Sequence, residues 1–188
     1  MSAGRLQQEP VLRAAGPVLR GSRRALTCLL ITAALIVAVP PQHAAVPVVV
    51  SYRHDLAKLT SLARYTVVVP GRLPPSWYPV SSGLAIGGAN GPGTATWHLG
   101  FWTPSGRLAS LEETDASPGE FVRRMTNDGT LERPVRVAGR AWDTRWNADR
   151  DQRSMYYTSR AGVTVVVTGD ATWAELRVLA ASLRPQPR

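Results

Sequence analysis

Residues 96–114 read TWHLGFWTPSGRLASLEET, and this stretch gives the clearest local prediction in the chain. Its middle, Thr103-Pro104-Ser105-Gly106, has the composition of a type I turn followed by a glycine with positive φ. The flanking residues are rich in aromatic side chains, which favour strands. The stretch therefore predicts a β-hairpin with arms at residues 95–103 and 107–114.

The turn also predicts the register of this hairpin. If Thr103 lies opposite Arg107, antiparallel pairing places His98 opposite Glu112. Because side chains alternate between the faces of a sheet, one face is expected to be core and to carry Trp97, Leu99, Phe101, Ala109 and Leu111. The other face would be partly wet and would carry His98, Trp102, Ser110 and Glu112. A slip of one residue would exchange the two faces.

His98 and Glu112 are the candidate catalytic residues. A histidine beside a carboxylate is equipment for acid–base chemistry, and it is also an ordinary cross-strand pair. Glu112, Glu113 and Asp115 together are interpreted as a solvated strand end, with paired glycosidase carboxylates as the alternative.

Helical periodicity and strand composition extend the prediction beyond the hairpin. Helices are expected at residues 51–65, 117–129 and 172–183. Capping boxes are expected for the second and third, from Ser117 with Glu120 and from Thr172 with Glu175. Residues 66–80 contain four prolines and should cross the domain in an extended form. Further strands are expected at residues 80–88, 133–138, 140–146, 153–160 and 163–168.

The segment VTVVVT at residues 163–168 is nearly all β-branched and is the best candidate for a central strand. Helices around antiparallel strands indicate an α+β fold. We expect an antiparallel sheet of about five to seven strands, packed against N-terminal, middle and C-terminal helices and preceded by one transmembrane helix.

The N-terminal region predicts a place in the cell. Arg23 and Arg24 precede the apolar residues 25–41, so residues 1–24 should form a basic cytoplasmic tail and residues 25–41 a transmembrane anchor. The apolar segment is short for a bilayer, so a cleaved signal peptide and twin-arginine export are alternatives. The rest of the chain would comprise a spacer at 42–50, an exported α+β domain at 51–184 and a tail at 185–188.

The composition limits the partners. The 188 residues carry a net charge of +9, spread along the chain, which favours anionic envelope surfaces. The chain has one cysteine, Cys28, which excludes an intrachain disulfide and a cysteine metal cluster. No nucleic-acid motif is present. The expected partners are the lipid bilayer, through residues 25–41, and an envelope lipid, a glycan or a membrane protein.

The sequence predicts no cofactor and no metal. It lacks the H-E-x-x-H metal motif, the phosphate-binding loop and an elbow serine of the G-x-S-x-G type. Asn147, Asp149 and Asp151 imitate the start of a calcium loop, but Gln152 replaces the required glycine.

Three tryptophans are candidate ligand-binding residues: Trp102, Trp142 and Trp146. Trp142 and Trp146 should share one face of a strand, because they are four residues apart. If exposed, they would stack on sugar rings or lie at a membrane interface, and if buried they would belong to the core.

The order of several segments resembles a known family. These segments are SYRHDLAKL, VVVPGRLPPSWYPVSS, WHLGFWTPSGRLASLEE, VAGRAW and VVVTGDATWAELRVLAASL, which follow a basic tail and one apolar span. The chain is similar over residues 22–184 to the actinobacterial domain-of-unknown-function family 4245. This resemblance implies a small single-pass membrane protein with an exported domain, and it implies no activity.

Two functions follow as hypotheses. The favoured one is a single-pass protein of the cell membrane, with its N-terminus in the cytoplasm and an extracytoplasmic globular domain that serves as a non-catalytic binding or structural module of the cell envelope. The alternative is an envelope hydrolase that uses His98 and Glu112 as an acid–base pair.

Overall fold

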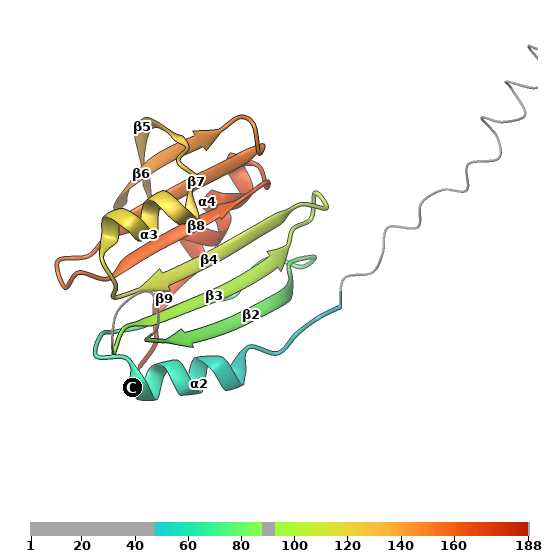
Figure 1. The fold of residues 1–188 in the computed structure, drawn as a ribbon. Coiled ribbons are helices and arrows are strands. Elements are labelled where there is room, and N and C mark those ends of the chain that lie inside the picture. Colours follow the sequence, from blue (N-terminus) through green and yellow to red (C-terminus); the bar gives the residue numbers. More distant parts are fainter. Residues whose placement is uncertain (1–47, 88–92, 188) are drawn as a thin grey trace, which may run out of the picture. The chain divides into compact units, whose positions relative to one another are not determined.

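The computed structural model describes residues 48–87 and 93–187. Within them, a seven-stranded antiparallel sheet, a two-stranded sheet and three helices form an α+β fold (Figure 1). The predicted fold class is therefore confirmed for the described part of the chain. The large sheet has seven strands, the upper end of the expected five to seven.

The large sheet has the strand order β2-β3-β4-β8-β7-β6-β5. In chain order its strands are β2 (Tyr78–Ile86), β3 (Ala95–Trp102), β4 (Leu108–Thr114), β5 (Thr130–Val137), β6 (Arg140–Asn147), β7 (Gln152–Thr158) and β8 (Thr164–Gly169). The helices are α2 (Arg53–Leu62), α3 (Pro118–Met125) and α4 (Trp173–Ser182).

The hairpin of β3 and β4 has the predicted register. His98 pairs with Glu112, Leu99 with Leu111 and Trp102 with Leu108. Trp97 and Leu111 are fully buried, as expected for the core face of the hairpin.

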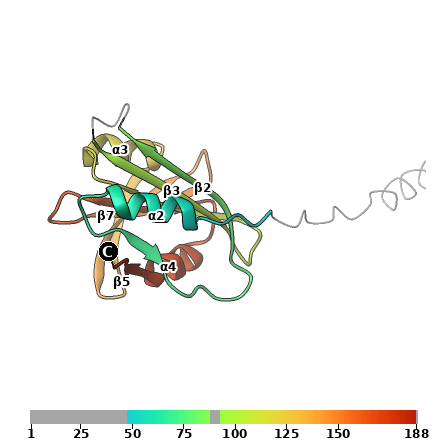
Figure 2. The ribbon, with the colours of Figure 1, turned by 90° about the horizontal axis from the view of Figure 1, so that it is seen from below.

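Strand β8 is the middle strand of the sheet, as its β-branched composition predicts. Its residues 164–168 are all buried, because helices cover it on both sides. Helices α3 and α4 lie on opposite faces of the sheet, and α2 runs along the edge strand β2 (Figures 1 and 2). The main hydrophobic core lies on the face of the sheet that carries α4. It combines residues of helices α2 and α4 with residues of the strands, including Leu59, Trp97, Leu111, Val165 and Leu176.

A second, two-stranded sheet was not predicted. It pairs β1 (Val68–Pro70) with β9 (Leu183–Pro185), and the amide of Gln186 then donates to the carbonyl of Val67 at 2.8 Å. Part of the proline-rich segment at residues 66–80 is thus hydrogen-bonded to the start of the expected tail at residues 185–188.

The two predicted capping boxes have different outcomes. Thr172 and Glu175 form the predicted box at the start of α4. The prediction for α3 is wrong, because Ser117 makes no side-chain cap hydrogen bond. The Glu120 carboxylate instead accepts hydrogen bonds from Arg123, at 2.9 Å for each of its oxygens. Helix α3 also ends at Met125, earlier than the expected residue 129.

The N-terminal predictions lie outside the described residues. They concern the basic tail at 1–24 with Arg23 and Arg24, the anchor at 25–41 and most of the spacer at 42–50. Among the helices of the described residues, none is long and apolar enough to cross a membrane.

Candidate functional site

Strands β2, β3 and β4 bring three polar side chains into one row on the sheet face that carries α3. The Nδ1 atom of His98 lies 2.6 Å from a carboxylate oxygen of Glu112. On the other side of the ring, Nε2 lies 2.8 Å from the hydroxyl oxygen of Ser81. The predicted pairing of His98 with Glu112 is thus present, and the structure adds Ser81.

A β-bulge places Ser81 in this row. The pairing of β2 with β3 shifts by one residue between Pro79 and Ser81, so that Ser81 lies opposite Gly100. The neighbouring Ser82 points to the other side, where its hydroxyl donates to Asp55 of α2.

Gly100 makes room for this contact. A Cβ atom at Gly100 would lie only 2.2 Å from the Ser81 hydroxyl oxygen and 3.3 Å from Nε2 of His98. Any other residue at this position would therefore separate the serine from the histidine.

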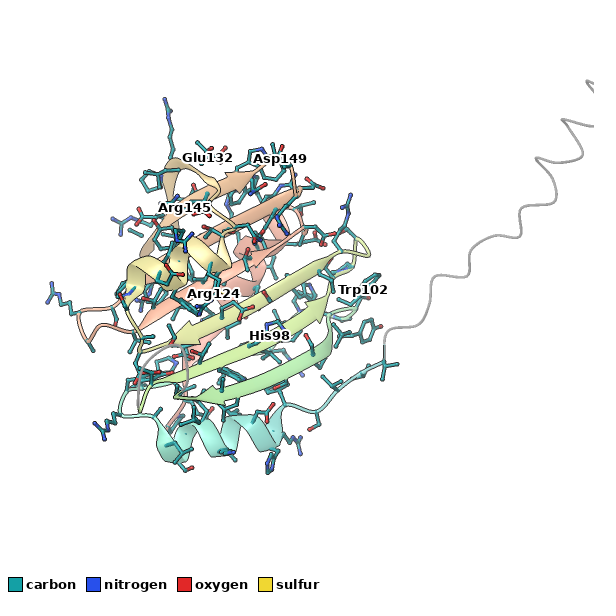
Figure 3. All side chains as sticks on the ribbon, viewed as in Figure 1. His98, Trp102, Arg124, Glu132, Arg145 and Asp149 are labelled. Atoms are coloured by element: carbon teal, nitrogen blue, oxygen red, sulfur yellow. The ribbon has the colours of Figure 1, made fainter. Side chains whose placement is uncertain are left out.

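The electrostatics of the row favour a charged histidine. The hydrogen bond to Glu112 raises the pKa of His98, burial lowers it in part, and the charge of Glu112 raises it further. With a carboxylate on Nδ1 and a hydroxyl on Nε2, the imidazole has the partners that a serine hydrolase uses to take a proton from its nucleophile. The His98 side chain is 40% exposed and lies in the middle of β3 on the α3 face of the sheet, whereas Trp102 lies at the end of that strand (Figure 3).

The tryptophan candidates lie apart from one another. Trp102 is partly exposed on the His98 face, opposite Tyr78 and Leu108, which are exposed. Trp142 is only 2% exposed and packs edge-on against Tyr157 with 4.8 Å between ring centroids. For Trp142, the core alternative is the correct one.

Trp146 is partly exposed on the face that also carries Trp142, and the guanidinium of Arg153 covers it at 4.3 Å. The tryptophans therefore do not form a common binding surface.

The opposite face of the sheet holds a cavity of about 750 Å³. It lies where β4 and β7 end and the antiparallel β8 begins. Its walls come from the segment after α2, from both strands of the small sheet and from the turn between β7 and β8. The residues around it are Arg64, Tyr65, Thr66, Val68, Glu113, Asp115, Arg140, Tyr157, Ser159, Ala161, Val163, Val165 and Pro185.

Glu113 is the unusual group of this cavity. It lies in a cross-strand row with Trp97, Val165 and Tyr157, on the core face of the sheet. The side chain is fully buried, and its two oxygens accept from the amide of Val68 at 3.1 and 3.3 Å. The expectation of a solvated strand end is therefore wrong for Glu113, and also for Glu112, which is buried on the other face.

Burial sets the protonation of Glu113. Desolvation raises its pKa to about 8, although the hydrogen bond from Val68 lowers it in part. At neutral pH the carboxyl is thus mostly protonated and can donate a hydrogen bond. Asp115, at the same end of β4, accepts from the amide of Ala95 at 2.7 Å.

The burial of Glu113 and the contact of Ser81 with His98 were not predicted from the sequence, and the reasons differ. Glu113 follows Leu111 by two residues, so the alternation of the predicted hairpin already places it on the core face. The position of Ser81 depends on the bulge, for which the sequence gives no local signal.

No group of three or more metal-binding side chains occurs in residues 48–87 and 93–187.

A family model for "Protein of unknown function (DUF4245)" matches residues 19–183 of the chain. The protein belongs to this family. No curated protein matches the sequence. Among solved structures, a crystal structure of MucB in complex with MucA(peri) is similar, with a TM-score of 0.35 and 12% sequence identity. The similarity covers 66% of this chain and 38% of that chain.

Membership of the DUF4245 family agrees with the resemblance found from the sequence, and it assigns no activity. The function has to be argued from the two sites themselves.

Proposed function

We propose that this DUF4245 protein is a non-catalytic binding module of the cell envelope, whose domain takes up a small ligand in the Glu113 cavity. The observation that carries the proposal is the cavity itself. Its volume of about 750 Å³ lies in the range of small-molecule sites, roughly 300–1,000 Å³. Such sites combine apolar walls with polar groups that orient the ligand. This cavity has both, and polar and charged residues form most of its lining.

The location is part of the proposal. Residues 25–41 would anchor the chain in the cell membrane after the flanking Arg23 and Arg24, with the domain outside. The apolar segment and its basic flank support this arrangement. An envelope lipid, a glycan component or a segment of a membrane protein would then be the available ligand.

Native mass spectrometry of the full-length protein, extracted gently from its own membrane, tests the binding function. We expect a reproducible added mass on the wild-type chain. Ala161 is exposed in the turn at the mouth of the cavity, so Ala161→Trp should obstruct entry and remove the added mass. Ala148→Trp, in the exposed turn between β6 and β7, is the matched control and should retain it. A bare wild-type mass would contradict the proposal.

A second candidate is a serine hydrolase, and the row of Ser81, His98 and Glu112 favours it. In that function His98 would accept the proton of the Ser81 hydroxyl while Glu112 holds the ring and stabilises its charge. The bond formed would join the Ser81 oxygen to the acyl carbon of the substrate, while the bond from that carbon to the leaving group breaks and His98 returns the proton to the leaving group. Water, deprotonated by His98, would then attack the acyl carbon and release the acid, and the proton would return to the Ser81 oxygen.

A fluorophosphonate probe distinguishes the two functions. The hydrolase requires labelling of Ser81 that disappears in Ser81→Ala and His98→Gln. Ser82→Ala removes the adjacent serine on the opposite side of the strand and should leave the labelling unchanged. An unlabelled wild-type protein that still carries a ligand would support the binding module alone.

A further inference from the structure

We propose that the Glu113 cavity binds an organic anion, a compound with a carboxylate, phosphate or sulfonate group on an apolar body. This inference rests on the proposed function, because it assumes that the cavity holds a ligand. It specifies the ligand by the charges and hydrogen-bond donors that surround the cavity.

Two arginines give the cavity its positive character. Arg64 and Arg140 both line it, and both are exposed at its rim. Among the ion pairs of residues 48–87 and 93–187, none involves either arginine. The guanidinium of Arg140 lies 3.9 Å from the ring centroid of Tyr157, which fixes its position at the cavity wall. An incoming anion would therefore meet two guanidinium groups that form no ion pair within the described part of the chain.

The buried groups add donors to these cations. Burial keeps Glu113 mostly protonated at neutral pH, so its hydroxyl can donate to an anion instead of repelling it. Burial also raises the pKa of Tyr157, whose phenol stays a donor. The titratable and charged groups that line the cavity from all its elements are Arg64, Tyr65, Glu113, Asp115, Arg140 and Tyr157. One oxygen of Asp115 accepts from the amide of Ala95 at 2.7 Å.

The remaining walls fit an apolar body. Val68 of β1, Pro185 of β9, and Val163 and Val165 around the start of β8 contribute aliphatic surface. A simple inorganic anion would leave this surface unused, whereas an amphiphilic anion would bury its apolar part there.

A cationic ligand is the alternative occupant. An amine would need an ionised Glu113, which costs the desolvation that keeps this carboxyl neutral. It would also lie between Arg64 and Arg140. The set of donors and cations therefore favours an anion.

Two fluorescent probes of similar shape test the inference on purified full-length protein. Anilinonaphthalene sulfonate carries an anionic group, and phenylnaphthylamine has the same aromatic body without it. We expect the anionic probe to bind more tightly. Arg140→Gln or Arg64→Gln should weaken it about tenfold, the loss of one charge-assisted hydrogen bond. Arg150→Gln, an exposed arginine at the opposite end of β6, should have no effect.

The dependence on pH gives a second readout. Between pH 7 and pH 9 Glu113 loses its proton and places a negative charge in the cavity, so the affinity for the anionic probe should fall. Glu113→Gln imitates the neutral carboxyl, so it should bind as the wild type does at pH 7 and keep that affinity at pH 9. Tighter binding at high pH, or loss of binding in Glu113→Gln, would overturn the inference.

The two proposals fail in different ways. If both probes bind equally and the arginine variants change nothing, the cavity binds ligands but has no preference for anions. If neither probe binds and Ala161→Trp changes no native mass, the binding function itself fails.

Discussion

The contact between Ser81 and His98 in the polar row of β2, β3 and β4 depends on the absence of a side chain at Gly100. Gly100 lies beneath the Ser81 hydroxyl, and the space of its absent side chain is where the serine meets His98. A position of this kind is sensitive to the smallest substitution, because the nearest atom is polar and hydrogen-bonded.

Gly100→Ala should therefore destabilise the domain by about 1–3 kcal/mol, the usual cost of overpacking. The added Cβ must push Ser81 away and so break its contact with His98. Urea unfolding measures the stability, and the chemical shifts of the His98 ring report the lost contact. Gly83→Ala is the matched control in β2, because a Cβ there meets nothing within 4 Å. Equal costs for both variants would contradict this account of Gly100.

Glu113 should make the stability fall as the pH rises. Its folded-state pKa is about 8, above the ordinary value of 4.5, so the folded protein binds the proton more tightly than the unfolded chain. The cost begins above pH 4.5, where only the unfolded chain ionises, and it is complete above pH 8. Glu113→Gln should remove a penalty on the order of a few kcal/mol at pH 9 and change little at pH 4. Denaturant unfolding of both proteins at the two pH values measures this difference.

At the scale of elements, local chemistry and tertiary pairing determined different parts of the structure. The Thr103-Pro104-Ser105-Gly106 turn and the β-branched residues of β8 carry their structure in their own sequence, and both were predicted. The strands β1 and β9 have three residues each and exist only because they meet, so neither has a local pattern. The bulge that moves Ser81 likewise depends on the pairing of β2 with β3. The His98–Glu112 pair could be predicted because the local turn sets its register. Ser81 could not be predicted, because its position depends on the pairing of β2 with β3.

The start of α4 is tied to the turn of the first hairpin. Glu175 accepts from the amide and hydroxyl of Ser105 as well as from Thr172. Partial burial opposes its ionisation, but the hydrogen bonds from Thr172, Ser105 and Thr103 outweigh this and lower the pKa of Glu175 to about 2.

Thr172→Ala should destabilise the domain by about 1 kcal/mol, the usual value for a lost N-cap. Ser117→Ala is the corresponding change in α3, where the serine makes no cap bond, and it should be close to neutral. Thermal unfolding of both variants measures the difference. A larger loss for Ser117→Ala would mean that its hydroxyl has another role.

At the scale of the whole molecule, the sheet separates two chemically distinct surfaces. One face carries the row of Ser81, His98 and Glu112, in which Glu112 is buried and the other two are half-buried, and the other face carries a cavity with a buried carboxyl and two arginines. Ligand uptake at the cavity does not require the histidine row, so substitutions at the two sites should act independently.

The proposed topology predicts the behaviour of reporters fused after Arg188. Alkaline phosphatase, which is active only after export, should be active, and a reporter that works only in the cytoplasm should be inactive. Deletion of residues 25–39 should reverse both results, because it removes the apolar segment. Cytoplasmic activity of the intact fusion would contradict the proposed location.

The position of β8 has a consequence for biosynthesis. β8 joins β4 to β7, yet it follows the other six strands of this sheet in the chain and is therefore the last of the seven to be synthesised. Until residues 164–169 emerge, β4 and β7 have unpaired edges, and such edges attract other extended chains. A nascent chain of this protein therefore has two half-sheets that cannot join until β8 has emerged, and holdase chaperones would be needed most in the interval before it does.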